Sequence, residues 1–265
     1  MSKTTAEKPI IFSREMADAI IAGRKTQTRR IVTPQPIDNT TVDGNFFEGN
    51  HKGYVKVDGH PNWAKQFAYQ FARWQPGDIL YVWENWKMVG WDFEESEVRI
   101  RYADGKEITF ATADDSDEPY MWIVKQFEKL TAKDIIAPVG NGDDEEEPLE
   151  FTGKKHPFSP SIHLPKWCSR IWLEVVSVRV ERLHDISKED AIAEGILQDE
   201  IGFKDYDLKR AEGYGHPDVD YPHVQDPRHS YLSLWEKING FESRNSNPWV
   251  WVIEFKVLTT EGEID

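Results

Sequence analysis

Two long runs of β-branched and aromatic residues constrain the fold of this chain most strongly. They are RIWLEVVSVRVERL at residues 170–183 and PWVWVIEFKVL at residues 248–258. Both consist largely of side chains that strands favour, so each predicts a long β-strand. Shorter runs of the same kind, PIIF at residues 9–12 and ILYVW at residues 79–83, predict two further strands.

A hairpin is expected in the middle of the chain. EVRIRYA at residues 97–103 and EITFAT at residues 107–112 both read as strands. Between them lies Asp104-Gly105, a dipeptide that favours the tight turn of a β-hairpin.

Helical spacing appears between the strands. Ser13 can cap a helix over REMADAIIAG, which Gly23 would end in the left-handed conformation. SYLSLWEKING places Leu232, Trp235 and Ile238 on one helical face. Because strands dominate the core pattern and helices lie between them, the sequence predicts an α+β fold.

DISKEDAIAEGI, at residues 185–196, is the clearest helix pattern. Ser187 and Asp190 have the spacing of a capping box, and Gly195 is a stop signal. Glu194 falls in the last turn, where the helix dipole disfavours an anion. A residue that breaks a local rule points to function, although an exposed glutamate at a helix end is the simpler interpretation.

Composition limits the class of protein. The chain has 265 residues, a formal net charge of −15 and one cysteine, Cys168. This acidity argues against a protein that coats nucleic acid, because phosphates would be repelled, but it allows a local basic pocket. No apolar run approaches the ~20 residues of a membrane helix, and the N-terminal residues lack a signal-peptide pattern. We therefore expect a cytoplasmic protein with no membrane partner and no internal disulfide.

The segment AGRKTQTRR, at residues 22–30, concentrates basic charge behind the first predicted helix. Lys25 and Thr28 are three residues apart, and an amine beside a hydroxyl can serve acyl transfer when burial or nearby cations lower the lysine pKa. The nearby cations are Arg24, Arg29 and Arg30. A solvated helix end, a phosphate grip and a catalytic group are all compatible with this spacing, and the first is the simplest.

The tetrapeptide WENW places two indoles around a carboxylate at the end of a predicted strand. Indoles stack on nucleobases, and a carboxylate accepts hydrogen bonds from exocyclic amines. Trp83, Glu84 and Trp86 are therefore candidate base-binding residues. The other interpretation is a pair of core tryptophans with a surface glutamate.

Signals for metal ligation and thiol chemistry are weaker. HPDVDYPHVQDPRH is broken by prolines and has no rigid element to fix ligand angles, so we expect a solvated loop. Its candidate ligands are His216, Asp218, Asp220, His223, Asp226 and His229. Cys168, five residues after His163, is expected to be a packed side chain. No metal and no cofactor is predicted, because no Gly-rich phosphate loop, HExxH or GxSxG pattern occurs.

Four segments together resemble the ASCH family of the PUA-like superfamily. In the family's order they are IIAGRKTQTRR (20–30), PGDILYV (76–82), DISKEDAIAEGI (185–196) and WVIEFKVL (251–258). The chain also looks like ASCH-containing proteins of tailed bacteriophages, which would place it in the cytoplasm of a bacterial host. The resemblance implies a single domain on a small, partly closed β-barrel with flanking helices. Large insertions would interrupt it near residues 34–70, 100–160 and 197–230.

The resemblance also implies a chemistry. Family domains of this type bind RNA, nucleosides or modified bases, and one branch is similar to a small amidohydrolase that deacetylates N4-acetylcytidine. Its G-R-K-T-x-T-x-R motif and later helix-end glutamate fall on Lys25, Thr28 and Glu194. By that likeness Lys25 is the general base, Thr28 the nucleophile or water-orienting hydroxyl, and Glu194 the proton handler or lysine partner. Arg24 and Arg29 would tune the lysine or hold substrate.

Three functions are therefore open. The first is an amidohydrolase acting on an acylated pyrimidine nucleoside or a related small amide. The second is a non-catalytic reader that holds a modified or flipped base between Trp83 or Trp86 and the basic segment. The third is an accessory protein or nuclease that binds RNA or single-stranded nucleic acid, which the acidity disfavours.

Overall fold

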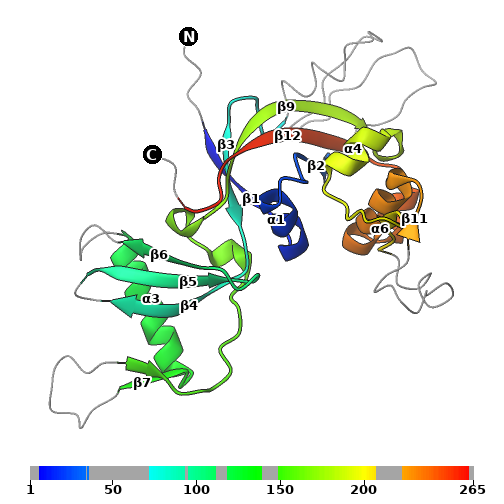
Figure 1. The fold of residues 1–265 in the computed structure, drawn as a ribbon. Coiled ribbons are helices and arrows are strands. Elements are labelled where there is room, and N and C mark those ends of the chain that lie inside the picture. Colours follow the sequence, from blue (N-terminus) through cyan, green and yellow to red (C-terminus); the bar gives the residue numbers. More distant parts are fainter. Residues whose placement is uncertain are drawn as a thin grey trace, which may run out of the picture. The chain divides into compact units, whose positions relative to one another are not determined.

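The computed structural model of this chain describes residues 6–33, 35, 72–92, 95–111, 118–138, 149–206 and 223–262. These residues form helices and open β-sheets, so the predicted α+β class is confirmed (Figure 1). Most of the predicted insertion at 34–70 lies outside the described residues. So do much of the insertion at 197–230 and most of the acidic segment between residues 140 and 150.

One five-stranded sheet contains both long strands predicted from the sequence. Its order is β1-β3-β9-β12-β2, so β9 and β12 are neighbours. Their bounds are β1 (Glu7–Ile11), β3 (Ile79–Trp83), β9 (Trp172–Arg182), β12 (Trp249–Thr259) and β2 (Gln27–Ile31). Because β1 and β2 are the two edges and do not pair with each other, this sheet is open. Within the described residues no sheet closes, and the closed form of the expected small barrel is not found.

The chain divides into two compact units. The first unit comprises residues 1–8, 15–80 and 173–258, and the second comprises residues 9–14, 81–172 and 259–265. The boundary passes through β1 and β3, which have residues in both units. The expectation of one domain with insertions therefore stays a prediction.

In the first unit, the predicted end signals set the bounds of two helices. α1 (Arg14–Ile21) ends just before Gly23, which has a φ of 70°. At α4 (Lys188–Ala193), the Ser187 hydroxyl accepts a hydrogen bond of 3.0 Å from the backbone N–H of Asp190. Gly195 follows the helix with a φ of 84°. The helix over residues 185–196 is therefore confirmed, though shorter than its pattern.

α6 (Pro227–Asn239) packs with α4 and β12 in the hydrophobic cluster of the first unit. Trp235 is buried as the sequence predicted, but Ile238 is 51% exposed. Tyr231 and Leu234 complete the buried face instead, one helical position from the predicted stripe. The same unit contains α7 (Phe241–Asn245) and the paired short strands β10 (Phe203–Lys204) and β11 (His223–Val224).

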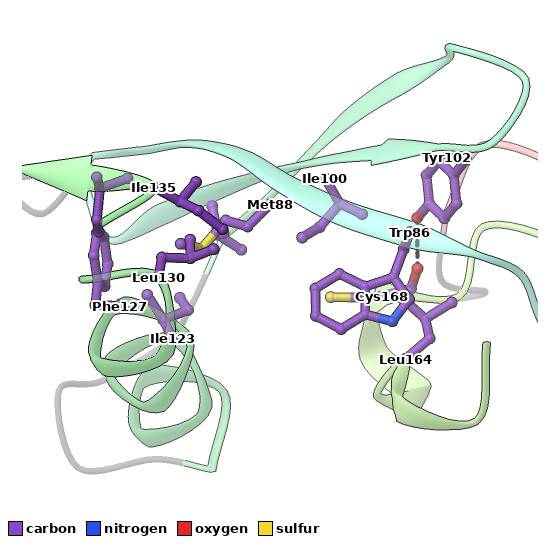
Figure 2. Close-up of a cluster of buried hydrophobic side chains, with 12 residues drawn as sticks. Trp86, Met88, Ile100, Tyr102, Ile123, Phe127, Leu130, Ile135, Leu164 and Cys168 are labelled. Carbon is purple, nitrogen blue, oxygen red and sulfur yellow. Dashed lines mark hydrogen bonds between the residues drawn. The ribbon is translucent and has the colours of Figure 1, made fainter. Parts of the chain in front are cut away.

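The second unit has its own sheet and its own core. The predicted hairpin is confirmed as β5 (Glu97–Tyr102) and β6 (Glu107–Ala111), and β4 (Trp86–Asp92) pairs antiparallel on the other side of β5. α3 (Glu118–Ala132), which the sequence analysis missed, covers one face of this sheet. Its Ile123 and Phe127 pack with Met88 and Ile100 in one buried cluster (Figure 2). β7 (Ile136–Pro138) and β8 (Leu149–Phe151) form a separate pair.

Gly195 is required both by its backbone conformation and by the space around it. A Cβ at this position would lie 2.7 Å from the Cβ of Lys25 and 3.0 Å from the Cβ of Ala19. Gly23 has a similar positive φ, but apart from its chain neighbours no described residue has an atom within 4 Å of the corresponding Cβ position. Both glycines therefore have left-handed backbone, but only Gly195 lacks room for a side chain.

We expect Gly195→Ala to destabilise the first unit more than Gly23→Ala. Both place a side chain in left-handed backbone, at a cost of about 1–2 kcal/mol. Only Gly195→Ala adds a clash with Lys25 and Ala19, worth roughly 1–3 kcal/mol more. Urea unfolding followed by circular dichroism measures the difference. Equal losses would mean that the Lys25 backbone can shift without cost.

Candidate functional site

Lys25 and Glu194 form a buried pair at the junction of α1, β2 and α4. After the turn at Gly23 the chain becomes extended, and Lys25 forms an isolated antiparallel bridge with Glu194. The Lys25 side chain is fully buried, and its Nζ donates hydrogen bonds to Glu194 Oε2 at 2.7 Å and to the Glu194 carbonyl at 2.9 Å. The solvated helix end that the sequence allowed is thus not what forms.

Burial changes the acidity of this lysine. It lowers the pKa of the Lys25 ammonium below its usual value, and the neighbouring Glu194 carboxylate only partly opposes that shift. A lowered pKa makes the neutral amine more accessible, as a general base requires. Burial contributes more to this lowered pKa than the nearby arginines, which the sequence had suggested as its cause.

Arg29 binds the second oxygen of the same carboxylate. Its NH1 donates to Glu194 Oε1 at 3.0 Å, and its NH2 donates to Asp190 Oδ2 at 3.1 Å and to Glu181. Each Glu194 oxygen therefore faces a different cation. Arg29 is 3% exposed, and its guanidinium lies over the Tyr231 ring at 5.6 Å. Among the described residues, its Nε has no hydrogen-bond partner.

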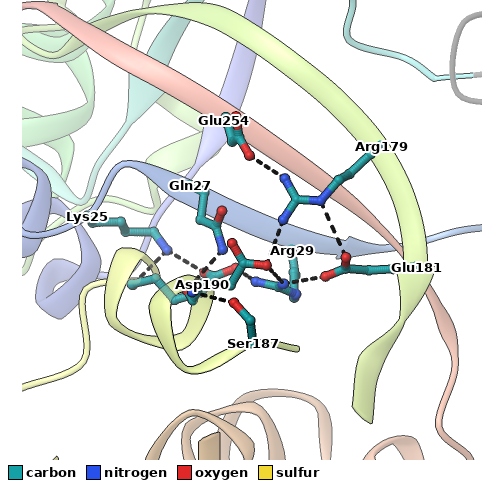
Figure 3. Close-up of polar contacts among 9 residues, drawn as sticks. Lys25, Gln27, Arg29, Arg179, Glu181, Ser187, Asp190 and Glu254 are labelled. Carbon is teal, nitrogen blue, oxygen red and sulfur yellow. Dashed lines mark hydrogen bonds and ion pairs between the residues drawn. The ribbon is translucent and has the colours of Figure 1, made fainter. Parts of the chain in front are cut away.

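A wider ion-pair network holds Arg29 in place (Figure 3). Arg179, on β9, donates to Asp190 Oδ2 at 2.7 Å and also contacts Glu181 and Glu254. Burial alone would raise the pKa of Asp190, but Arg179 and Arg29 outweigh it and hold that pKa below its usual value. The capping-box carboxylate therefore binds two arginines.

Thr28 lines a small cavity beside this network. The cavity has a volume of about 70 Å³ and is also lined by Glu194, Arg29 and Arg30. Its apolar wall comes mainly from α6, through Tyr231, Leu234, Trp235 and Ile238. The Thr28 hydroxyl has no hydrogen-bond partner in the described part of the chain.

Strand geometry separates the Thr28 side chain from that of Lys25. Successive side chains of an extended strand point to opposite faces. Lys25, Gln27 and Arg29 all hydrogen-bond to Asp190 or Glu194, so they share the α4 side. Thr28 is out of phase with these three residues, so its side chain points to the opposite face of the strand. Thr28 and Glu194 both line the cavity, and Lys25 is not among its described lining residues. Glu194 is thus the member of the pair that lines the same cavity as Thr28.

The other predicted substrate contacts are placed differently. Arg24 is exposed, and its NH1 donates to the Gly195 carbonyl at 2.9 Å. Trp83, Glu84 and Trp86 belong to the second unit, whereas the Lys25 network belongs to the first. Trp86 is only 2% exposed in the core of the second unit, and Trp83 is half-buried against it.

Glu84 is engaged in an ion pair of its own. Arg170 Nε and NH2 donate to the two Glu84 oxygens at 2.9 and 2.7 Å, and Arg170 NH2 also lies 2.8 Å from Asp104. The Arg170 guanidinium lies over the Tyr102 ring at 4.3 Å. A bidentate pair of this kind fixes the carboxylate, so contact with a base edge would have to displace Arg170.

The weaker sequence signals find little support. His223 contacts Asp199 at 2.6 Å, and Asp226 caps α6, while His216, Asp218 and Asp220 lie outside the described residues. Among the residues that the structure describes, no group of three His, Cys, Asp or Glu could hold a metal. Burial raises the pKa of the Cys168 thiol well above its usual value, which suits a packed side chain. No described helix is long and apolar enough to cross a membrane.

We expect Arg29→Lys to destabilise the protein far more than Arg24→Lys. Lysine keeps the charge but cannot bridge Glu194, Asp190 and Glu181 at once, and breaking such a buried pairing typically costs about 3–5 kcal/mol. Arg24 is exposed and makes one hydrogen bond, so its loss should cost about 1 kcal/mol or less. Denaturant midpoints of the two matched variants test this. Similar midpoints would mean that the network adds no stability through its geometry.

Asp190 should give the protein an acid-sensitive component of stability. Its pKa is lowered in the folded state, so its contribution is complete above its usual pKa and is lost as the pH falls through the lowered value. The stability gap between wild type and Asp190→Asn should therefore be largest near neutral pH and shrink below about pH 4. Denaturant unfolding between pH 3 and pH 7 measures it. Asp185→Asn, at a nearby exposed position, is the control, and a gap independent of pH would contradict the assignment.

Comparison of this chain with protein-family models, with curated proteins and with solved structures finds no match.

Proposed function

We propose that this protein is an amidohydrolase that removes a small acyl group from the exocyclic amine of a pyrimidine nucleoside or from a related small amide. The observation that carries the proposal is the fully buried Lys25 held 2.7 Å from Glu194, beside a cavity that Glu194 shares with Thr28. Strongly perturbed ionisable groups beside a cavity are common at active sites. Burying such a pair is also weakly stabilising at best, which favours a functional reason for keeping it.

Acyl transfer can proceed through Thr28, Glu194 and Lys25 in that order. The Thr28 hydroxyl attacks the acyl carbon and forms an ester, and its proton passes to the Glu194 carboxylate, whose Oε2 is held by Lys25. The pair returns a proton to the departing nitrogen as the C–N bond breaks, and water then hydrolyses the ester. Glu194 is thus the proton relay that meets the substrate, and Lys25 sets its proton affinity. Arg29 positions the carboxylate.

The size of the cavity favours a small acyl group. Its volume of about 70 Å³ is far below the roughly 300–1,000 Å³ of a site that encloses a whole drug-sized ligand. An acetyl group fits such a space, and the amine-bearing remainder of the substrate would lie outside it. The apolar wall from α6 suits the acyl methyl group, and the charged wall suits the carbonyl.

The resemblance of four sequence segments to the ASCH family supports this proposal. Lys25, Thr28 and Glu194 occupy the family's motif positions, and the segments that resemble it form α1, β2, α4 and β12. On the same basis we propose that the five-stranded sheet corresponds to the family's PUA-like barrel in an open form. Action in the cytoplasm of a bacterial host would suit a nucleoside substrate.

We expect hydrolysis of N4-acetylcytidine to cytidine and acetate, and a fall in kcat of roughly 10²–10⁴-fold in Thr28→Ala, Lys25→Ala and Glu194→Gln. Liquid chromatography with mass spectrometry measures the product. Thr26→Ala is a matched control, because Thr26 is an exposed threonine two residues away on the same segment. Trapping of an acyl group on Thr28 would identify the nucleophile.

A panel of other N-acylated nucleosides and small amides tests the substrate class. Binding of the acylated nucleoside by the folded wild-type protein without any product would sink the hydrolase proposal and favour a reader of modified bases. Equal turnover by wild type and Thr28→Ala would remove Thr28 from the mechanism.

A further inference from the structure

A cluster of cations surrounds two aromatic side chains in the second unit, well outside the segments that resemble the ASCH family. Lys87 on β4 lies opposite Arg101 on β5. The Lys87 ammonium is 5.0 Å from the centre of the Phe158 ring and 3.5 Å from the His156 carbonyl. The chain after β8 therefore runs beside the outer face of β4 and brings its own charges there.

His156 lies within this group of charges. Its ring stacks on Phe151, with ring centres 5.5 Å apart. Burial lowers the pKa of His156, and the charges of Lys87, Arg101 and Lys133 lower it further, so cations from three parts of the chain act on one ring. We call this surface the basic edge. Its members are Lys87, Arg101, Lys133, Lys154, Lys155, His156, Phe151 and Phe158.

Part of this charge is not neutralised by its surroundings. Arg101 is paired with Glu107, and Lys154 with Asp134 at 2.8 Å. Lys133 and Lys155 are exposed and form no ion pair with any residue that the structure describes. In a chain of net charge −15, these lysines form a local positive region, and a polyanion that approaches it has to overcome the long-range repulsion of the rest of the chain.

Aromatic side chains are exposed within the same surface. Phe158 is 40% exposed and Phe151 is 39% exposed. Proteins that bind single-stranded nucleic acid combine exposed aromatic rings with lysines and arginines, because the phosphates pair with the cations and the bases stack on the rings. A duplex hides its base faces and could use only the charges.

We propose that the basic edge binds a short stretch of single-stranded nucleic acid, with the cations on phosphates and Phe158 stacked on a base. The site is distinct from the Lys25 cavity, and its existence does not depend on the proposed hydrolase. The net negative charge of the chain limits the footprint to a few nucleotides and makes binding weak and strongly dependent on salt.

The test is fluorescence anisotropy with a labelled oligothymidine of about a dozen nucleotides, titrated with the full chain at several salt concentrations. If the protein contacts about four phosphates, doubling the salt should weaken binding about sevenfold, since the slope for single strands is about −0.7 per contact. The matching duplex should bind more weakly, and a polyglutamate peptide of equal charge should compete poorly. Residues 143–147, DDEEE, lie outside the described residues. A variant with Asn and Gln there is measured in parallel so that the chain's own acidic residues do not mask the site.

Paired variants locate the site. Lys133→Gln with Lys155→Gln should weaken binding and reduce the salt slope by about 1.4. Lys125→Gln with Lys129→Gln removes the same charge from exposed positions of α3 outside the basic edge and should have little effect. Phe158→Leu keeps an apolar side chain but loses stacking, and should weaken binding at least about fivefold.

Several results would overturn the proposal. Equal affinity in the two lysine pairs would place binding elsewhere. Equal binding of polyglutamate and oligothymidine, or no effect of Phe158→Leu, would make the basic edge a general polyanion or acidic-protein site. If neither the wild type nor the Asn/Gln variant binds oligothymidine at about 50 mM salt, the basic edge is not a nucleic-acid site.

Discussion

The buried contact of Lys25 and Arg29 with the Glu194 carboxylate is the interaction on which the first unit depends. Lys25 lies 169 residues from Glu194 in the sequence and Arg29 lies 165 residues from it, so this contact connects the segment after α1 to the end of α4. Each partner needs the others, because any one of these charges alone in this interior would be expensive to bury. The close approach at Gly195 and the cap at Ser187 both serve to bring this carboxylate to this lysine.

The network also explains a local anomaly of the sequence. A glutamate in the last turn of a helix faces the negative end of the dipole, which costs some stability at an exposed site. At Glu194 two cations from the neighbouring segment more than offset that cost, and the orientation of the carboxylate is fixed from both sides. A carboxylate held in this way keeps one geometry, which catalysis requires and stability alone does not.

Local signals predicted most of the strands and helix ends, because caps, turns and alternation act over a few residues. They also pointed to Lys25 and Glu194, each unusual in its own segment. The sequence did not predict the roles of Arg179, Glu181 and Asp190. Their pairing joins β9 to α4, and a contact between two elements produces no recognisable spacing in the sequence. Charged residues alternating with valines along β9 were a signal that a polar network faces that strand. α3 was missed although its apolar residues recur at helical spacing, and the open edges of the sheet depend on long-range pairing.

The two groups of positive charge in this acidic chain follow different physical rules. At the Lys25 site the cations are buried and matched by carboxylates, so their effect is confined to one cavity and hardly depends on salt. At the basic edge, Lys133 and Lys155 are exposed without a described ion-pair partner, so their field extends into solvent and is screened by salt. The first arrangement suits chemistry on a small substrate, and the second suits capture of a flexible polyanion. If both proposals hold, raising the ionic strength should leave turnover of a free nucleoside nearly unchanged while it weakens retention of an oligonucleotide, so the two proposed activities can be separated by salt.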